Sequence, residues 1–91
     1  MNVEKLFKAL ACKWRIEILK QVAKQDMCIC ELEALNHIDK TTLSRHISLL
    51  ENVGIVELKR EGQRKRIVLK DPRVMELIQL AEQIAEKTKE V

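Results

Sequence analysis

The chain has 91 residues, of which 46% are hydrophobic, and a formal net charge of +3. A single small domain (residues 1–91) buries only about 60–65% of its unfolded surface, so a partner subunit could cover part of this aliphatic surface. The sequence shows no secretory leader and no run of about 18 apolar residues, which predicts a cytoplasmic protein that does not span a membrane. It also shows no glycine-rich phosphate loop and no triad spacing, so we do not expect an enzyme.

The positive charge is concentrated in one short segment. Residues 59–66 hold five basic residues and one acidic residue, which gives a local charge of +4. The other 12 basic and 13 acidic residues leave the rest of the chain at −1. A basic cluster on an otherwise nearly neutral chain is typical of a nucleic-acid contact, and a merely solvated loop is the alternative.

Two helices are predicted at the start of the chain. Residues 2–11 carry an apolar stripe at helical spacing behind Asn2, which is a favourable capping residue. Residues 13–24 carry apolar side chains most of the way around, which predicts a central and buried helix. Arg15 lies within this second helix, and we expect it to form a surface or capping ion pair, because a buried arginine needs a partner.

The next two helices have the pattern of a helix-turn-helix, at about residues 28–53. A short helix at 28–36 is followed by a turn of three to four residues and a longer helix that ends near Gly54. Asp39 or Thr41 can cap the longer helix. Its polar face is rich in hydroxyl and basic groups, which bind phosphate oxygens and base edges in the DNA major groove. The predicted DNA contacts from this helix are Lys40, Thr41, Thr42, Ser44, Arg45 and His46.

Residues 55–69 change from helical spacing to alternation and predict a two-stranded hairpin. A two-residue turn at Gly62 and Gln63 puts glycine at the first central position, as a type II′ turn requires. This register pairs Leu58 with Ile67 on one apolar face. A hairpin with a basic tip after a recognition helix is the wing of a winged helix. The predicted DNA contacts from the wing are Arg60, Gln63, Arg64, Lys65 and Arg66.

The chain ends in a predicted helix at about residues 72–88, which Asp71 and Pro72 introduce. Its apolar stripe is larger than one small winged domain needs, so we interpret it as a dimerisation helix. A helix folded back on its own core is the alternative. The predicted dimer interface consists of Val74, Leu77, Ile78, Ala81 and Ile84.

The predicted fold is therefore mainly α, of the α+β class. It is a winged helix-turn-helix in which four helices precede a two-stranded β-wing and a C-terminal dimerisation helix. Four stretches of this order carry a further resemblance: residues 10–19, 28–32 and 43–50, and residues 54–56 together with 60–62.

These stretches resemble the ArsR/SmtB family of metal-responsive winged-helix repressors. The resemblance implies a homodimeric transcriptional regulator that leaves double-stranded operator DNA when an effector binds. The chain departs from the family at residues 12–14, where Cys-Lys-Trp replaces the usual Asp-Pro-Thr. The terminal helix has no histidine, so the family's His/Asp zinc site at the dimer interface is not expected.

The three cysteines supply the predicted sensing site. An odd number of cysteines without a secretory leader indicates reduced thiols. Cys28 and Cys30 stand at a helix start, where the helix dipole favours thiolate, and thiolates select soft ions. The resemblance marks this pair as a soft-metal signature. The candidate effector ions are arsenite, antimonite, cadmium, copper(I) and zinc, and no cofactor is expected to be required for DNA binding.

Cys12 is a candidate third metal ligand. The intervening helix of twelve residues spans about 18 Å and separates it from Cys28, so a three-sulfur site is more plausible across a dimer than within one chain. Three other interpretations stay open. The cysteines are ordinary packed side chains, or they form a thiol redox switch, or the chain is a winged-helix protein-interaction module without a metal effector.

Overall fold

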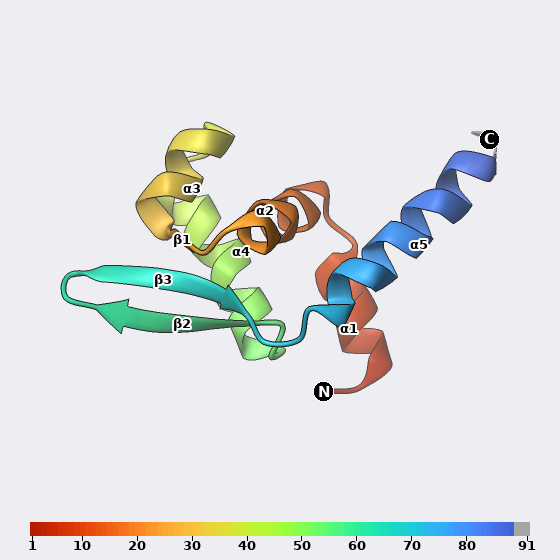
Figure 1. Cartoon of the computed structure of the whole chain (residues 1–91), viewed down its shortest axis with the longest axis horizontal. Helices are drawn as coiled ribbons and strands as arrows, with labels where there is room; N and C mark the ends of the chain where they lie inside the picture. The colour runs from red at the N-terminus through yellow and green to blue at the C-terminus, as the bar shows by residue number, and fades with distance from the viewer. Residues whose placement is uncertain (89–91) are drawn as a thin grey trace.

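The predicted order of helices and wing is present in the computed structural model, which describes residues 1–88. In chain order the elements are α1 (Val3–Leu10), α2 (Lys13–Lys24), β1 (Met27–Cys28), α3 (Ile29–Asn36), α4 (Lys40–Asn52), β2 (Val56–Glu61), β3 (Arg64–Leu69) and α5 (Arg73–Lys87). Figure 1 shows the β2–β3 hairpin extending from one side of the helices and α5 from the other. The winged helix-turn-helix prediction is confirmed.

The wing has the predicted register, with Leu58 opposite Ile67 across an antiparallel β2–β3 pair. Gly62 has a φ of +61° while Gln63 has no positive φ, as a type II′ turn requires. Because a shift by one residue would turn every side chain to the opposite face, the buried position of Ile67 specifies this register strongly.

The sheet also contains a third strand that the sequence did not predict. The two-residue strand β1 pairs with β3, so the strand order is β1-β3-β2. Met27 lies opposite Ile67, and Cys28 lies opposite Arg66. Two residues are too few to show alternation, which is why the prediction of a two-stranded wing was incomplete. This short strand ties the base of the wing to the start of α3.

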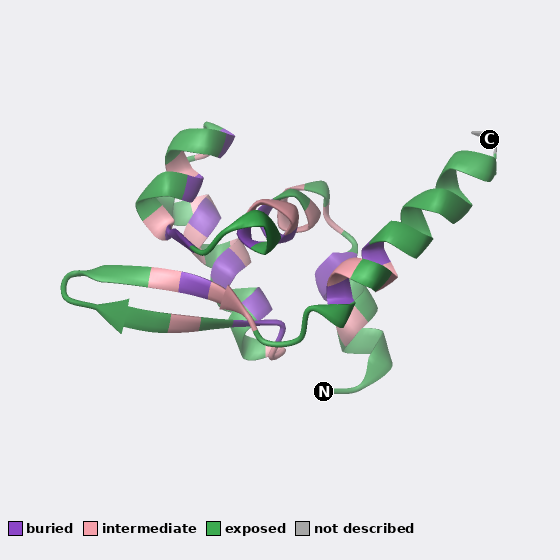
Figure 2. Cartoon of the chain, viewed as in Figure 1, coloured by how far each residue is buried: buried purple, intermediate pink, exposed green. Residues whose placement is uncertain are grey.

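The core forms around α2, which packs against α1, α4, α5 and β3. Figure 2 shows that buried positions concentrate where the helices meet the base of the wing. The largest fully buried side chains are Ile18, Leu19, Leu32, Leu43, Ile47, Leu50, Val56 and Ile67. The predicted central position of α2 is therefore confirmed, although its edge at Ala23 is exposed.

A pair of amides joins α3 to α2. Asn36 is buried, and its Nδ2 donates to Oε1 of Gln21 at 2.9 Å and to the carbonyl of Leu32 at 2.7 Å. Gln21 Nε2 donates in return to Asn36 Oδ1 at 3.1 Å. Because a buried amide must be hydrogen-bonded, this pair fixes the end of α3 just before the turn into α4. Within residues 1–88, no helix has the length and apolarity needed to cross a bilayer.

Candidate nucleic-acid interface and cysteine pair

The ends of α4 are set by local sequence. The carboxylate of Asp39 accepts hydrogen bonds from the backbone N–H of Thr42 at 3.0 Å and from its hydroxyl at 2.7 Å. The bond from that hydroxyl is the main reason why the pKa of Asp39 lies below its usual value. His37, in the preceding turn, has a φ of +51°, which histidine adopts more readily than most residues. Gly54 follows the helix with a φ of +85°.

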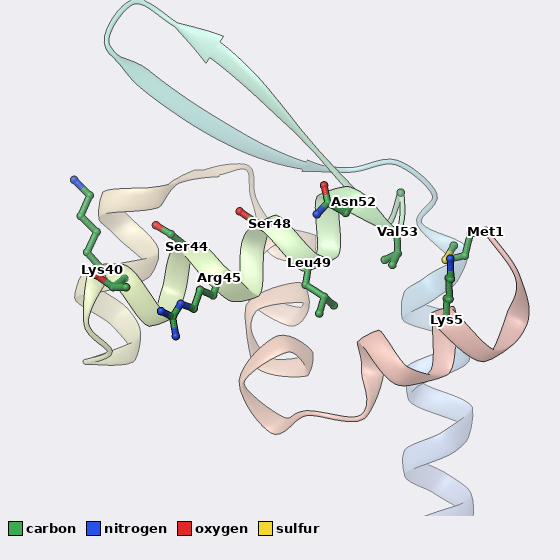
Figure 3. Close-up of a pocket in the computed structure, with 11 residues that line it drawn as sticks. Met1, Lys5, Lys40, Ser44, Arg45, Ser48, Leu49, Asn52 and Val53 are labelled. Atoms are coloured by element: carbon green, nitrogen blue, oxygen red, sulfur yellow. The ribbon is translucent and has the colours of Figure 1, made fainter.

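The outer face of α4 lines an open groove of about 1200 Å³. Figure 3 shows Lys40, Ser44 and Ser48 along the edge of α4 nearer the wing, and Arg45 on its other edge. The polar groove residues supplied by α4 are Lys40, Thr41, Ser44, Arg45, Ser48 and Asn52. Hydroxyl, amide and guanidinium groups on one helix face are suited to hydrogen-bond phosphates and base edges.

Two of the six residues predicted to contact DNA from α4 are engaged elsewhere in the fold. The hydroxyl of Thr42 donates to the capping Asp39. The Nδ1 atom of His46 lies 3.2 Å from Nη1 of Arg15, outside the groove lining. Lys40, Thr41, Ser44 and Arg45 do lie in the groove. DNA contact by any of the six stays a prediction.

Three polar groove residues are absent from the predicted contacts, namely Ser48, Asn52 and Lys5. Asn52 follows Ser48 by one helical turn, so continuing the spacing along α4 would have found it. Lys5 comes from α1 and reaches the groove only through the packing of the helices (Figure 3). The residues next to Lys5 in the sequence do not indicate that it lies in this groove.

The wing tip exposes four of its five predicted DNA-contact residues. The exposed residues are Arg60, Gln63, Arg64 and Lys65. Arg66 is instead half-buried and ion-paired, with Nη1 3.2 Å from Oδ2 of Asp26 and Nη2 3.4 Å from Oε2 of Glu61. A DNA phosphate would have to compete with these two carboxylates for Arg66. Arg66 is therefore less available to DNA than the exposed residues at the tip.

Cys28 and Cys30 form a disulfide, whereas the sequence analysis expected reduced thiols. Their Cα atoms are 5.5 Å apart, which is within the range that a disulfide spans. The two residues are this close because Ile29, which lies between them, is the first helical residue of α3. Cys28 is buried and Cys30 is exposed. The backbone N–H of Cys28 donates to Oε1 of Glu31 at 3.0 Å, which caps α3.

This cysteine pair lies at the same surface as the recognition helix. Cys28 and Cys30 line a cleft of about 370 Å³ between α3, α4 and the wing. The cationic side chains of this cleft are Lys40, Arg64 and Lys65. Sequence reasoning placed the pair only on the helix that supports α4, and it missed this proximity to the wing.

Cys12, the candidate third ligand, is half-buried just before α2 and is not disulfide-bonded. Among residues 1–88, no group of three or more His, Cys, Asp or Glu side chains is arranged to hold a metal ion. After reduction of the disulfide, one chain therefore supplies two cysteine sulfurs as metal ligands at this pair. Soft ions bind such sulfurs readily, but tetrahedral zinc needs two further ligands.

The residues predicted at the dimer interface fall into two groups. Val74 and Ile78 are buried in the core of their own chain. Leu77 is half-buried, while Ala81 and Ile84 are exposed. The first turns of α5 therefore fold back on the core, as the alternative interpretation proposed, and the later turns leave it.

A larger apolar surface than predicted surrounds these exposed residues. Leu80 on α5 is 55% exposed, and Phe7 on α1 is 53% exposed. Phe7, Leu77 and Ala81 line an apolar groove between α1 and α5. The sequence analysis identified the apolar stripe of α1 but did not include this helix in the predicted dimer interface.

Comparisons with known proteins agree with this arrangement. Residues 12–57 match the family model described as "Bacterial regulatory protein, arsR family". The cadmium resistance transcriptional regulatory protein CadC homolog of Staphylococcus aureus is 32% identical over 82 residues, which are 89% of this chain and 68% of that protein. The matched segment contains the cysteine pair and the whole of α4.

Solved structures show the same fold. The homodimeric winged helix-turn-helix DNA-binding domain of Mb0332 from Mycobacterium bovis superimposes with a TM-score of 0.84 at 28% identity, covering 97% of this chain and 82% of that one. Reduced HlyU from Vibrio cholerae N16961 gives a TM-score of 0.78 at 26% identity, covering 88% of this chain and 84% of that one.

Proposed function

Because this chain belongs to the arsR family of bacterial regulatory proteins, we propose that it is a homodimeric, sequence-specific DNA-binding transcriptional repressor. The observation that carries the proposal is the polar face of α4, which lines an open groove on the same side as the exposed basic wing. Its partner is double-stranded operator DNA, which places it in the cytoplasm. A protein-interaction module would need neither this groove nor a basic wing tip.

The DNA-facing residues divide by their position. Arg45 and Ser44 lie on the outer face of α4, where side chains meet base edges in the major groove. Arg64 and Lys65 lie at the exposed wing tip, where they meet phosphates of the flanking backbone. Lys40, at the first turn of α4, lies between these two groups and takes a phosphate. Arg45 thus carries sequence preference, and the wing carries salt-dependent affinity.

The dimer surface is the apolar patch formed by α1 and the later turns of α5. It contains Phe7, Leu77, Leu80, Ala81 and Ile84. The related Mb0332 domain is homodimeric, and it aligns with nearly all of this chain. A two-fold axis through this patch would present two α4 helices to two half-sites, which a palindromic operator matches.

The proposed effector is a thiophilic metal or metalloid ion at Cys28 and Cys30. The relative from Staphylococcus aureus is described as a cadmium resistance regulator, and soft ions prefer thiolate ligands. The pair lines the cleft that also contains Lys40 and Arg64, so an ion there changes the spacing of α4 and the wing. A three-sulfur site would additionally require Cys12 from a second copy.

Release from DNA requires that the ion bind the free dimer more tightly than the DNA-bound dimer. A coupling of about 1–3 kcal/mol is typical, which corresponds to about 5- to 150-fold in affinity. The coupling is reciprocal, so operator DNA must weaken ion binding by the same factor.

The test is operator affinity by fluorescence anisotropy, in reductant, with and without arsenite, antimonite, cadmium, copper(I) and zinc. At least one ion should weaken wild-type binding at least about fivefold. The Cys28→Ser, Cys30→Ser double variant should bind DNA normally and ignore the ion. Cys12→Ser should have a smaller effect, unless the site bridges two subunits. If no ion changes wild-type affinity more than about twofold, the metal-sensing proposal is wrong while DNA binding stands.

A thiol redox switch is the second candidate, and the disulfide between Cys28 and Cys30 favours it. A peroxide would take two electrons and two protons from the two thiols, giving one disulfide and two waters. The bond links β1, which pairs with the wing, to the first turn of α3. Operator affinity of the peroxide-treated protein, with thiol alkylation and mass spectrometry as the readout of oxidation, tests it. Equal affinity of the oxidised and reduced forms would exclude this candidate.

A further inference from the structure

Arg15 makes three hydrogen bonds that join separate helices. Its Nε donates to the carbonyl of Ala9 at 2.6 Å, and Nη2 donates to the carbonyl of Lys8 at 3.2 Å. These carbonyls belong to the last turn of α1. Its Nη1 lies 3.2 Å from Nδ1 of His46 on α4. The expected ion pair is replaced by two backbone carbonyls and an imidazole.

The contact with Arg15 determines the tautomer and the charge of the His46 imidazole. An arginine guanidinium donates hydrogen bonds and does not accept them, so Nδ1 of His46 must accept and the ring proton must lie on Nε2. Burial, and then the charge of Arg15, lower the pKa of His46, which keeps the imidazole neutral. A protonated ring would lose this bond and face the guanidinium as a like charge.

The three bonds connect the two functional surfaces of the molecule. The helix α1 carries Phe7 and Leu10 of the apolar groove against α5, which forms the proposed dimer surface. His46 lies on α4, whose outer face is the proposed DNA surface. Arg15, on α2 between them, has a planar fork that reaches both at once.

We propose that Arg15 is a positioning residue that holds the recognition helix α4 at a fixed place relative to α1, and thereby to the dimer axis. His46 is its acceptor on α4. Operator binding depends on the contact because two half-sites tolerate little error in the spacing of two recognition helices. This inference rests on the proposed DNA-binding function, but not on any metal or redox effector.

The test is a double-mutant cycle between Arg15→Met and His46→Ala, measured on operator DNA and on random-sequence DNA. Arg15→Met should weaken operator binding at least about fivefold and leave random-DNA affinity within about twofold, because the phosphate contacts remain. The double variant should be no weaker than the weaker single variant. His46→Gln, whose side-chain oxygen can still accept, should recover most of the loss, whereas Arg15→Lys should not.

Nitrogen NMR of the His46 ring gives a readout that a loss of stability does not move. In wild type, Nδ1 should be unprotonated and hydrogen-bonded, and Arg15→Met should abolish that signature in folded protein. If the two substitutions act additively, His46 contacts DNA directly and the positioning role is wrong. If Arg15→Met weakens operator and random DNA equally, Arg15 is a general structural or electrostatic residue and the proposal fails. If the wild-type protein bound no DNA sequence more tightly than random DNA, the proposed function itself would be wrong.

Discussion

The helices α4 and α5 both bury one face, but they leave opposite chemistry exposed. In α4, Leu43 and Ile47 are buried in the core, and the outer face is polar and basic. In α5, Val74 and Ile78 are buried, while Ile84 is 59% exposed. Figure 2 shows that the later turns of α5 are exposed throughout, well away from the core.

This difference indicates two different partners. A polar face with hydroxyl and guanidinium groups costs little free energy when it is exposed to water, and it can form directional hydrogen bonds to a nucleic acid. An exposed apolar stripe gains free energy by burial against another protein surface, at roughly 25 cal/mol per Å² of apolar area. The first half of α5 therefore completes the chain's own core, and the second half is available to a second copy.

The largest expected effect comes from charging the later turns of α5. Leu80→Glu together with Ile84→Glu should give monomers by sedimentation and weaken operator binding more than about 100-fold, because one subunit cannot hold two half-sites. Circular dichroism should stay unchanged, since both side chains are exposed. Gln79→Glu is the control, because Gln79 lines the side of α5 that faces α2, and it should stay dimeric. A dimeric double variant would remove α5 from the interface.

Substitutions on the buried face of α4 should lower the stability of the fold instead of preventing dimerisation. Ile47→Ala should lower the free energy of unfolding by about 2–5 kcal/mol, because it leaves a cavity in the core. Ser48→Ala, one residue further and exposed, should change it by less than about 0.5 kcal/mol. Urea unfolding at a fixed protein concentration measures both. Equal effects would mean that α4 is not held by its apolar face.

The outer face of α4 should carry sequence preference. Arg45→Ala should cost about 1–3 kcal/mol on operator DNA for each lost base contact and much less on random DNA. Titration of both duplexes at one salt concentration gives the ratio. An equal loss on both duplexes would make Arg45 a phosphate contact.

The wing should contribute to DNA affinity without contributing to sequence preference. Arg64→Ala should weaken operator and random DNA alike and reduce the slope of log affinity against log salt by about one per lost phosphate contact in each subunit. Arg66→Ala is the matched comparison, and its change in slope should be smaller, because Asp26 and Glu61 already pair with it. A larger change for Arg66 would show that DNA displaces both carboxylates.

The smallest effect concerns the start of α5. Hydrogen bonds from Arg73 lower the pKa of Asp71 to about 2, so the folded state holds the carboxylate more strongly than the unfolded chain does. The stability that Asp71 contributes is present above about pH 4 and is lost as the pH falls towards 2. Melting temperatures of wild type and Asp71→Asn should therefore converge over this range. A constant difference between them would contradict this linkage.

The sequence predicted the elements whose signals are local. Asn2 and Asp39 cap helices as expected, and Gly62 sets the hairpin turn and its register. The features it missed depend on packing between distant segments. Strand β1 exists because β3 lies beside it, and Lys5 reaches the groove because α1 packs on α2.

The candidate site was predictable in kind but not in arrangement. The basic and hydroxyl residues of α4 and the wing were identified from spacing. The ion pair of Arg66 with Asp26 and the bond from Arg15 to His46, however, join residues 40 and 31 positions apart. The placement of Cys28 and Cys30 in one cleft with Arg64 is likewise a product of the folded sheet. No local pattern encodes such contacts.

The central claim is that two copies of this chain read DNA through α4. Selection of bound duplexes from a random-sequence pool by the reduced wild-type protein tests it most directly, because no operator has to be assumed. The account predicts enrichment of an inverted repeat whose half-site centres are about 10–10.5 base pairs, or a multiple, apart, with the complex containing two chains per duplex. Enrichment of no sequence, or of a single half-site bound by one chain, would contradict it.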